Sequence, residues 1–237
     1  MEPAIDLINP TIFVWGWEIR EPITSLTDLL VAGCALFFYA QLGLRKPLHR
    51  VEKLMRGYFL FMGLGTGLSG ILGHGLQAYL SWEWKALGWI ISCVGVACYA
   101  MSAACLVQPR LPGRYYRLII NLVGVLLLGL LLALAWPPTR NFDVVRWYNM
   151  SCILGVVLPL HLYGWLQEKN HGSGWVLISM VVGIMVALVF SQQLNFGPWF
   201  NHNDISHVLM MVHTYILYLA TQRFLPGEAV PLTATEQ

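Results

Sequence analysis

Charged side chains are scarce in this sequence. They make up only 11% of its 237 residues, whereas hydrophobic residues make up 57%. A soluble domain carries about a quarter charged residues. The composition therefore excludes an ordinary soluble domain and predicts an integral, multi-pass membrane protein.

Cysteine is also sparse and lacks metal-binding spacing. None of the five cysteines belongs to a CxxC pair, so the sequence indicates neither a zinc ribbon nor a disulfide framework. All lie within apolar segments, where we expect them to be small packing residues. They are Cys34, Cys93, Cys98, Cys105 and Cys152.

Long polar stretches are missing as well, which leaves no room for a soluble domain. Each of seven apolar segments is near the roughly 20 residues that a helix needs to cross a bilayer. The sequence therefore predicts an all-α, seven-helix membrane domain over residues 1–224 and a flexible tail over 225–237. The expected spans are 24–44, 56–80, 86–107, 115–136, 143–167, 174–193 and 204–223. Before them, "TIFVWGW" is too short for a signal-peptide core, so we expect the first helix to direct insertion.

Basic residues collect in alternate loops. Ten lie on one side of the expected helices and four on the other, which by the positive-inside rule predicts an outer N-terminus and a cytoplasmic C-terminus. The basic loops need no partner beyond membrane lipids, and we infer no nucleic-acid binding. The two groups are Arg45, Lys46, Arg50, Lys53, Arg56, Arg110, Arg114, Arg117, Lys169 and Arg223 against Arg20, Lys85, Arg140 and Arg146.

The second apolar segment contains the glycine-rich run "GLGTGLSGILGHG". Its match to GxGxxG does not follow a strand, so it does not indicate a dinucleotide site. Small residues four apart, such as Gly63 with Gly67 and Ser69 with Gly73, instead predict close packing of neighbouring helices.

Polar residues of four expected helices lie at one depth, in the outer half of the membrane. An ionisable side chain within a span costs about 2.5–3.5 kcal/mol and usually faces the bundle interior. We therefore expect a buried polar site there, although helix-end residues in the headgroup layer, or Asp204 as a helix cap, would explain any single position. The residues are Glu21, Thr24, Ser25 and Asp28; Ser69, His74 and Gln77; Ser191, Gln192 and Gln193; and His202, Asn203, Asp204, Ser206 and His207. His161 and His213 stand alone on their helices, and we expect them to be hydrogen-bonded packing residues.

Imidazole together with carboxylate or amide oxygen is a ligand set for zinc, which needs three protein ligands and an open position to activate water. Asn203 and Asp204 can each share a helical face with His207, whereas His202 joins them only if the last helix begins after it. His74 completes the set from the second helix.

Taken with their order, these motifs resemble the alkaline ceramidase family and its superfamily of seven-helix membrane hydrolases, which includes the progestin and adiponectin receptors and lipid-anchor remodelling factors. "EPITSLTD" is similar to the family's first element, with Glu21 in the glutamate position and Thr24, Ser25, Thr27 and Asp28 in the polar ones. His74 matches the histidine of the family's second helix, and His207 the second histidine of its last helix.

Three positions depart from the family pattern. Ser69 lies five residues before His74 rather than four, which leaves Gly70 in the serine position, and Asn203 replaces the first histidine of the last helix. Where the family has an aspartate at the start of the third helix, this chain has "SWEWK", with Lys85 near that position and Glu83 the closest carboxylate. Either His202, Asp204 or Glu83 has replaced the family's missing ligands, or the metal has been lost.

The resemblance implies a membrane-embedded, zinc-dependent hydrolase of a lipid amide or ester. His74 and His207 would bind zinc with Asp204 or Asn203, Ser69 would stabilise an oxyanion, and Asp204 or Glu83 would move a proton. Glu21 and Asp28 would tie down the N-terminal segment, with calcium as a second cation.

Two alternatives remain open at this point. The first is a non-catalytic receptor for a lipid or another ligand, or an accessory membrane subunit, that keeps the fold without the metal. The second is a b-type haem protein with His74 and His207 as axial ligands. The sequence indicates no particular protein partner.

Overall fold

The computed structural model describes residues 10–44, 48–81 and 83–224. The expected tail, residues 225–237, lies outside the described residues, as do the basic residues Arg45 and Lys46.

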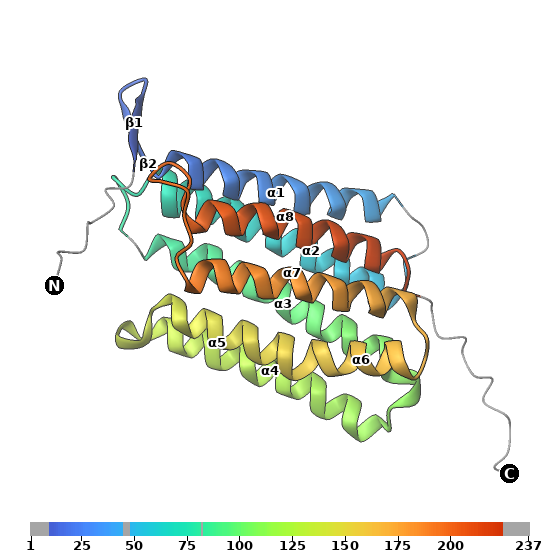
Figure 1. Cartoon of the computed structure of the whole chain (residues 1–237). Coiled ribbons are helices and arrows are strands. Elements are labelled where there is room, and N and C mark those ends of the chain that lie inside the picture. Colours follow the sequence, from blue (N-terminus) through green and yellow to red (C-terminus); the bar gives the residue numbers. More distant parts are fainter. Residues whose placement is uncertain (1–9, 45–47, 82, 225–237) are drawn as a thin grey trace, which may run out of the picture.

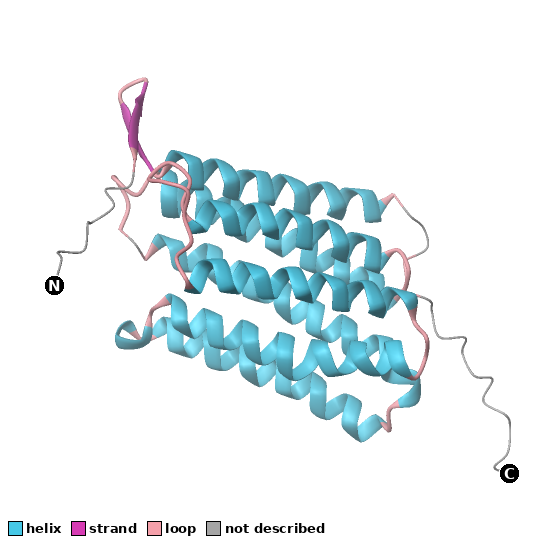
Figure 2. Cartoon of the chain, in the orientation of Figure 1, coloured by secondary structure: helices cyan, strands magenta, loops and turns pink. Residues whose placement is uncertain are grey.

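Almost all of the described chain is helical (Figures 1 and 2). The π-helical segment η1 continues α2, and a second π-helical segment, η4, joins α5 to α6, so that eight α-helices form seven continuous helical rods. The elements are α1 (Pro22–Gly43), α2 (Arg50–Leu68), η1 (Ser69–Gly75), α3 (Trp84–Val107), η2 (Gln108–Arg110), α4 (Gly113–Ala135), η3 (Pro137–Thr139), α5 (Phe142–Cys152), η4 (Ile153–Val157), α6 (Leu158–Leu166), α7 (His171–Ser191) and α8 (His202–Thr221).

Five of the seven rods are long and apolar enough to cross a membrane, which makes the chain a multi-pass membrane protein. They are Pro22–Gly43, Trp84–Arg110, Gly113–Ala135, Phe142–Leu166 and His171–Ser191. The expected spans 56–80 and 204–223 do form helices, α2 with η1 and α8. These two rods carry His74 and His207 with their polar neighbours, which lowers their apolar content.

The rods pack side by side in a single bundle (Figure 1). α1 contacts both α2 and α8, α7 covers the other side of α8, and α3 packs between α2 and α4. Phe59, Met55 and Leu217 are fully buried within the core between these helices. α4 lies at the edge, where Leu118, Val125 and Leu132 are 63–65% exposed, as expected for a surface that faces lipid.

Glycines allow the closest helix contacts, as the small-residue spacing predicts. A Cβ atom on Gly65 would lie 2.1 Å from Ser92 Oγ, and one on Gly88 would lie 2.2 Å from Ser69 Oγ, so α2 and α3 can meet only without these side chains. α7 and α8 meet similarly, because a Cβ on Gly172 would lie 2.8 Å from the Ala220 carbonyl oxygen.

An antiparallel hairpin precedes α1, and the sequence patterns did not predict it. β1 (Thr11–Val14) pairs with β2 (Trp17–Arg20) through a two-residue turn (Figure 2). Both turn residues have positive φ, Trp15 at 49° and Gly16 at 83°, as a tight hairpin of this length requires. Glycine adopts this conformation easily, but a bulky residue rarely does, so the turn had no typical sequence signature.

Candidate functional site

Five ionisable residues lie together where η1 and the first turns of α1 and α8 come to one end of the bundle, beside the hairpin (Figure 1). α1 lies at the centre of this arrangement, because it contacts both η1 and α8. Glu21 and Asp28 come from α1 and its cap, His74 from η1, and Asp204 and His207 from α8. We call these five residues the polar cluster.

Asp28 lies at the centre of the polar cluster and is 4% exposed. Its Oδ1 atom is 3.2 Å from His207 Nε2, and its Oδ2 atom is 3.8 Å from His74 Nε2. One buried carboxylate therefore lies between two imidazoles that arrive from helices far apart in sequence.

Glu21 fixes the other nitrogen of His74. Its carboxylate contacts His74 Nδ1, and because a carboxylate only accepts hydrogen bonds, Nδ1 carries a proton; Nε2 faces Asp28. Glu21 adopts a left-handed backbone (φ 46°) immediately before Pro22 starts α1, a conformation that costs about 1–2 kcal/mol for a non-glycine residue. Its backbone N–H donates to the Pro10 carbonyl at 3.0 Å, which holds this turn in place.

Thr27 holds His207 by its Nδ1 atom, as Glu21 holds His74. Its hydroxyl oxygen lies 2.8 Å from His207 Nδ1 and 3.3 Å from Asp204 Oδ1. The Thr27 hydroxyl oxygen thus holds His207 at Nδ1, and Nε2 of His207 faces Asp28. The other oxygen of Asp204 accepts from the Asn201 backbone N–H at 2.7 Å, which completes a capping box at the start of α8. Asp204 thus lies behind His207 and orients it through Thr27.

Gly70 makes room for Asp28. A Cβ on Gly70 would lie 2.7 Å from Asp28 Cβ and 3.1 Å from the Ser25 carbonyl oxygen. This is the position where the resemblance expects a serine, so the space for that side chain is taken here by the aspartate. Single-turn π-helical segments such as η1 often mark functional sites.

Lys85 supplies a positive charge beside the polar cluster. Its stem packs against the backbone of η1, since a Cβ on Gly73 would lie 2.7 Å from Lys85 Cγ. The Lys85 ammonium attracts the Asp28 carboxylate, whereas the carboxylates of Asp204 and Glu21 repel it. A cation of the chain itself therefore partly compensates three carboxylates.

Four residues expected at the site lie beside the polar cluster without joining its contacts. Ser69 Oγ contacts the backbone of α3 at Gly88, and the His202 ring packs against Phe190 with centroids 5.4 Å apart. The backbone N–H of Asn203 donates to the capping side chain of Asn201 at 2.8 Å.

The fourth, Glu83, is exposed at the N-cap of α3, where a hydrogen bond from Ser81 holds the pKa of its carboxyl below the usual range.

Two further expected residues support the backbone of the site. The Ser25 hydroxyl donates to the Gly70 carbonyl at 2.7 Å and so ties α1 to η1. The Thr24 carbonyl accepts from the Thr27 hydroxyl at 3.1 Å. The central position of Asp28, between the two histidines, was not expected from the sequence.

His161 and His213 are hydrogen-bonded packing residues, as predicted. His161 is buried, its Nδ1 lies 3.1 Å from Ser173 Oγ, and its ring stacks on Phe224. His213 Nδ1 donates to the Ser179 carbonyl at 2.8 Å.

The polar cluster contains the kinds of donor that zinc takes, imidazole nitrogen and carboxylate oxygen. Zinc ligands 2.0–2.1 Å from a tetrahedral ion lie about 3.3 Å from one another, close to the 3.2 Å and 3.8 Å that separate Asp28 from the two Nε2 atoms. The carboxylate on His74 Nδ1 is also typical of a zinc-binding histidine. As the side chains stand, however, no three histidine, cysteine, aspartate or glutamate residues in the described ranges surround a single metal position. Binding would draw the three donors together.

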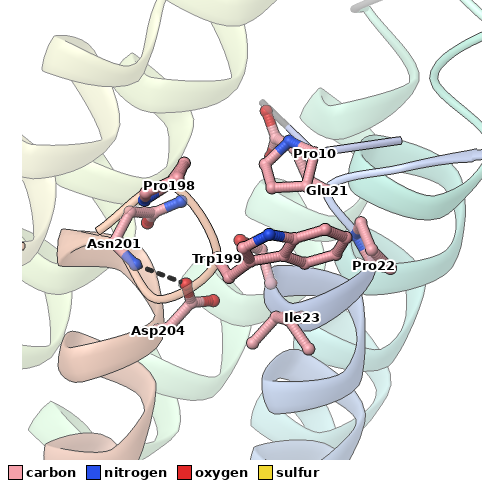
Figure 3. A pocket seen from close by; sticks show the side chains of 9 residues that line it. Pro10, Glu21, Pro22, Ile23, Pro198, Trp199, Asn201 and Asp204 are labelled. Carbon is pink, nitrogen blue, oxygen red and sulfur yellow. Dashed lines mark hydrogen bonds between the residues drawn. The ribbon is translucent and has the colours of Figure 1, made fainter. Parts of the chain in front are cut away.

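A shallow surface pocket, too narrow to enclose a water molecule, lies beside the polar cluster at the end of the bundle (Figure 3). Trp199 lies across it, between Pro22 at the start of α1 and Asp204 on α8. Glu21, Ile23, Thr24, Pro10, Pro198 and Asn201 line the remainder.

These features define a multi-pass, helical membrane protein with a buried cluster of histidines and carboxylates at one end of its bundle. The chain belongs to the family of unknown function DUF6962, which it matches over residues 23–226. A search of curated proteins found no match.

Proposed function

We propose that this chain is a membrane-embedded hydrolase of a lipid amide or ester, with a divalent metal bound by His74, His207 and Asp28. The observation that carries the proposal is the shared carboxylate: both Nε2 atoms face Asp28, while partners hold both Nδ1 atoms. Asp28 takes the place of the ligands that the sequence suggested, Asp204, Asn203, His202 or Glu83.

The proposal includes seven membrane spans with the N-terminus outside. α2 and α8 would cross the membrane with the five apolar rods because they pack within the same bundle. Arg50 starts α2, Arg114 lies in the first turn of α4, and Arg110 ends η2, which directly follows α3. All three lie at the end of the bundle opposite the polar cluster. This charge distribution supports a position of the polar cluster in the outer half of the membrane.

Each residue of the polar cluster would have a definite part. A zinc ion bound there would supply a water molecule whose pKa is lowered to about 7. Glu21 and Thr27 hold the two imidazoles by Nδ1 so that both Nε2 atoms face the site, where each would coordinate the metal after giving up any proton that it carries. Glu21 also lines the pocket, where it could accept a proton from water and pass it to the leaving group.

A second candidate, a non-catalytic receptor for a lipid or other ligand, is favoured by Lys85. Its ammonium attracts Asp28 and so offers the charge compensation that a metal would otherwise provide. Haem ligation is less compatible with the geometry, because both Nε2 atoms face Asp28.

Metal analysis tests the proposal. The purified protein, loaded with zinc and then dialysed, should retain about one ion per chain by elemental analysis. Asp28→Asn, His74→Ala and His207→Ala should each lower zinc affinity by more than about 100-fold, since each removes a ligand. His213→Ala is the matched control: it removes a histidine of the same helix as His207 and should leave zinc binding unchanged.

An activity assay separates the two candidates. Zinc-loaded protein in lipid vesicles should release fatty acid from N-acyl or O-acyl lipids, and the His207→Ala variant should not. A folded wild-type protein that binds no zinc would overturn the hydrolase and leave the receptor, and a visible haem absorption band would overturn both.

A further inference from the structure

The hairpin of residues 11–20 carries three exposed aromatic side chains beside the polar cluster. Phe13 is 74% exposed, Trp15 at the turn is 97% exposed, and Trp17 is 55% exposed. A two-stranded hairpin alone is only marginally stable in water, and one that exposes two indoles to water is unusual.

The hairpin nevertheless has a fixed position relative to the bundle. The Glu18 backbone N–H donates to the Tyr79 hydroxyl at 2.8 Å, and the rings of Trp17 and Tyr79 meet edge to face with centroids 5.2 Å apart. Tyr79 follows η1, so the hairpin is fastened to the same end of the bundle that holds the polar cluster.

Its direction differs from that of the helices. In Figure 1 the helices run along the bundle, whereas the hairpin leaves the start of α1 and projects sideways, across the helix axes. Because the apolar helices cross the membrane along their axes, a sideways projection at their ends runs along the membrane surface.

The two faces of the hairpin differ in polarity. Residues paired across an antiparallel sheet share a face, so Ile12, Val14, Trp17 and Ile19 form one apolar face. The opposite face combines Phe13 and Thr11 with the ion pair of Glu18 and Arg20, whose atoms lie 2.9 Å apart. Tryptophan is enriched where the headgroup layer meets the acyl chains, because its ring is amphipathic.

We propose that this hairpin lies in the headgroup layer of the leaflet at the polar-cluster end, with Trp15 and Trp17 inserted to the level of the upper acyl chains. The partner is the lipid surface itself. The hairpin would thereby hold the shallow surface pocket at the depth of the lipid ester and amide bonds. The placement rests on membrane insertion alone and does not require a metal or a hydrolytic reaction.

Tryptophan quenching in lipid nanodiscs tests the placement. The emission of Trp15 is obtained as the difference between wild type and Trp15→Phe, and Trp17 is treated in the same way with Trp17→Phe. Each difference is measured in nanodiscs of phosphatidylcholine, of phosphatidylcholine brominated on its acyl chains, and with aqueous iodide. Trp147→Phe supplies a reference for lipid contact, because Trp147 is 68% exposed on the rod Phe142–Leu166, which is long and apolar enough to cross a membrane.

The brominated lipid should quench most of the Trp15 and Trp17 emission, as it should for Trp147, and iodide should quench little. Emission quenched by iodide and untouched by brominated lipid would place the hairpin in water and overturn the proposal. Emission shielded from both quenchers would show a protein contact, such as a second copy of the chain, and would overturn it too. Both Phe variants keep an aromatic ring, and their elution as monodisperse protein checks that they fold.

Discussion

His161 and His213, which lie away from the polar cluster, differ from His74 and His207 in what faces their rings. Nδ1 of His161 lies beside a hydroxyl and Nδ1 of His213 donates to a backbone carbonyl, and both partners are neutral. His74 and His207 face carboxylates instead, and the Nε2 atoms of both face Asp28. A histidine therefore becomes a candidate ligand through the charges around it rather than through burial, since His161 is more buried than either His74 or His207. Four substitutions test this difference between the two sets of histidines.

The largest effect is expected from Gly70→Ala. The added methyl group would lie 2.7 Å from Asp28 Cβ and would push the carboxylate out from between the two histidines. We expect zinc affinity to fall about 100-fold, comparable to the loss of a critical partner. Gly67→Ala is the control, because its new Cβ would be 3.4 Å from Ala32 Cβ, an ordinary contact. Equal affinities of the two variants, measured by competition with a chelating dye, would show that the position of Asp28 is unimportant.

Glu21→Gln tests whether the negative charge on His74 matters. Glutamine can keep a hydrogen bond to Nδ1 but removes the charge that makes the imidazole a better donor to a metal. Substitutions of such partners typically weaken metal binding by about 10–100-fold. Glu18→Gln is the control, because it removes a carboxylate of the hairpin that pairs with Arg20. Zinc titration of this variant should give the wild-type affinity.

Lys85→Met should act in the opposite direction. Its ammonium attracts Asp28 and would repel a bound cation, so its removal should tighten zinc binding by about tenfold, or 1.4 kcal/mol. Lys53→Met, on the exposed side of α2, should have no effect. Weaker zinc binding by Lys85→Met would indicate that the lysine organises the polar cluster, and would favour the receptor.

The smallest effect on the metal is expected from Ser173→Ala, which addresses the other pair. It removes the hydroxyl beside His161 Nδ1 and should lower the free energy of unfolding by about 1–3 kcal/mol. Thermal unfolding in detergent measures this loss, and Ser191→Ala, at an exposed site, should cost little. Zinc binding should remain at the wild-type level. A change in zinc affinity would show that His161 is not independent of the polar cluster.

Composition and spacing were sufficient to predict the helical bundle and the meeting of polar residues from α1, η1 and α8, whereas Ser191, Gln192 and Gln193 of the expected polar layer are exposed and do not join them. Glu21 and Asp28 share a helical face by their spacing alone, and their contacts with His74 confirm that this face points inward. Apolar length also located the helices to within a few residues, as α1 (Pro22–Gly43) shows against the expected 24–44.

The centre of the polar cluster could not be predicted in the same way. Asp28 reaches the histidines because Gly70, on another helix, leaves space for it, and such complementarity between distant positions leaves no local pattern. Asp204 matched two sequence patterns, that of a metal ligand and that of a helix cap. Only the hydrogen bond that it accepts from the Asn201 N–H shows that it caps α8. The hairpin was missed because Trp15 occupies a turn position where small residues are typical.

The glycine contacts between neighbouring helices bear on how this protein enters the membrane. α2 and α8, which carry the two histidines of the polar cluster, are the rods that do not qualify as spans by their own apolar content. Each fits closely against an apolar neighbour, α2 against α3 at Gly65 and Gly88, and α8 against α7 at Gly172. Pairing before or during insertion would cover the polar face of each weak segment. The insertion machinery would therefore handle α2 with α3, and α7 with α8, as helical hairpins, so that the polar cluster is assembled only when the two hairpins close around α1.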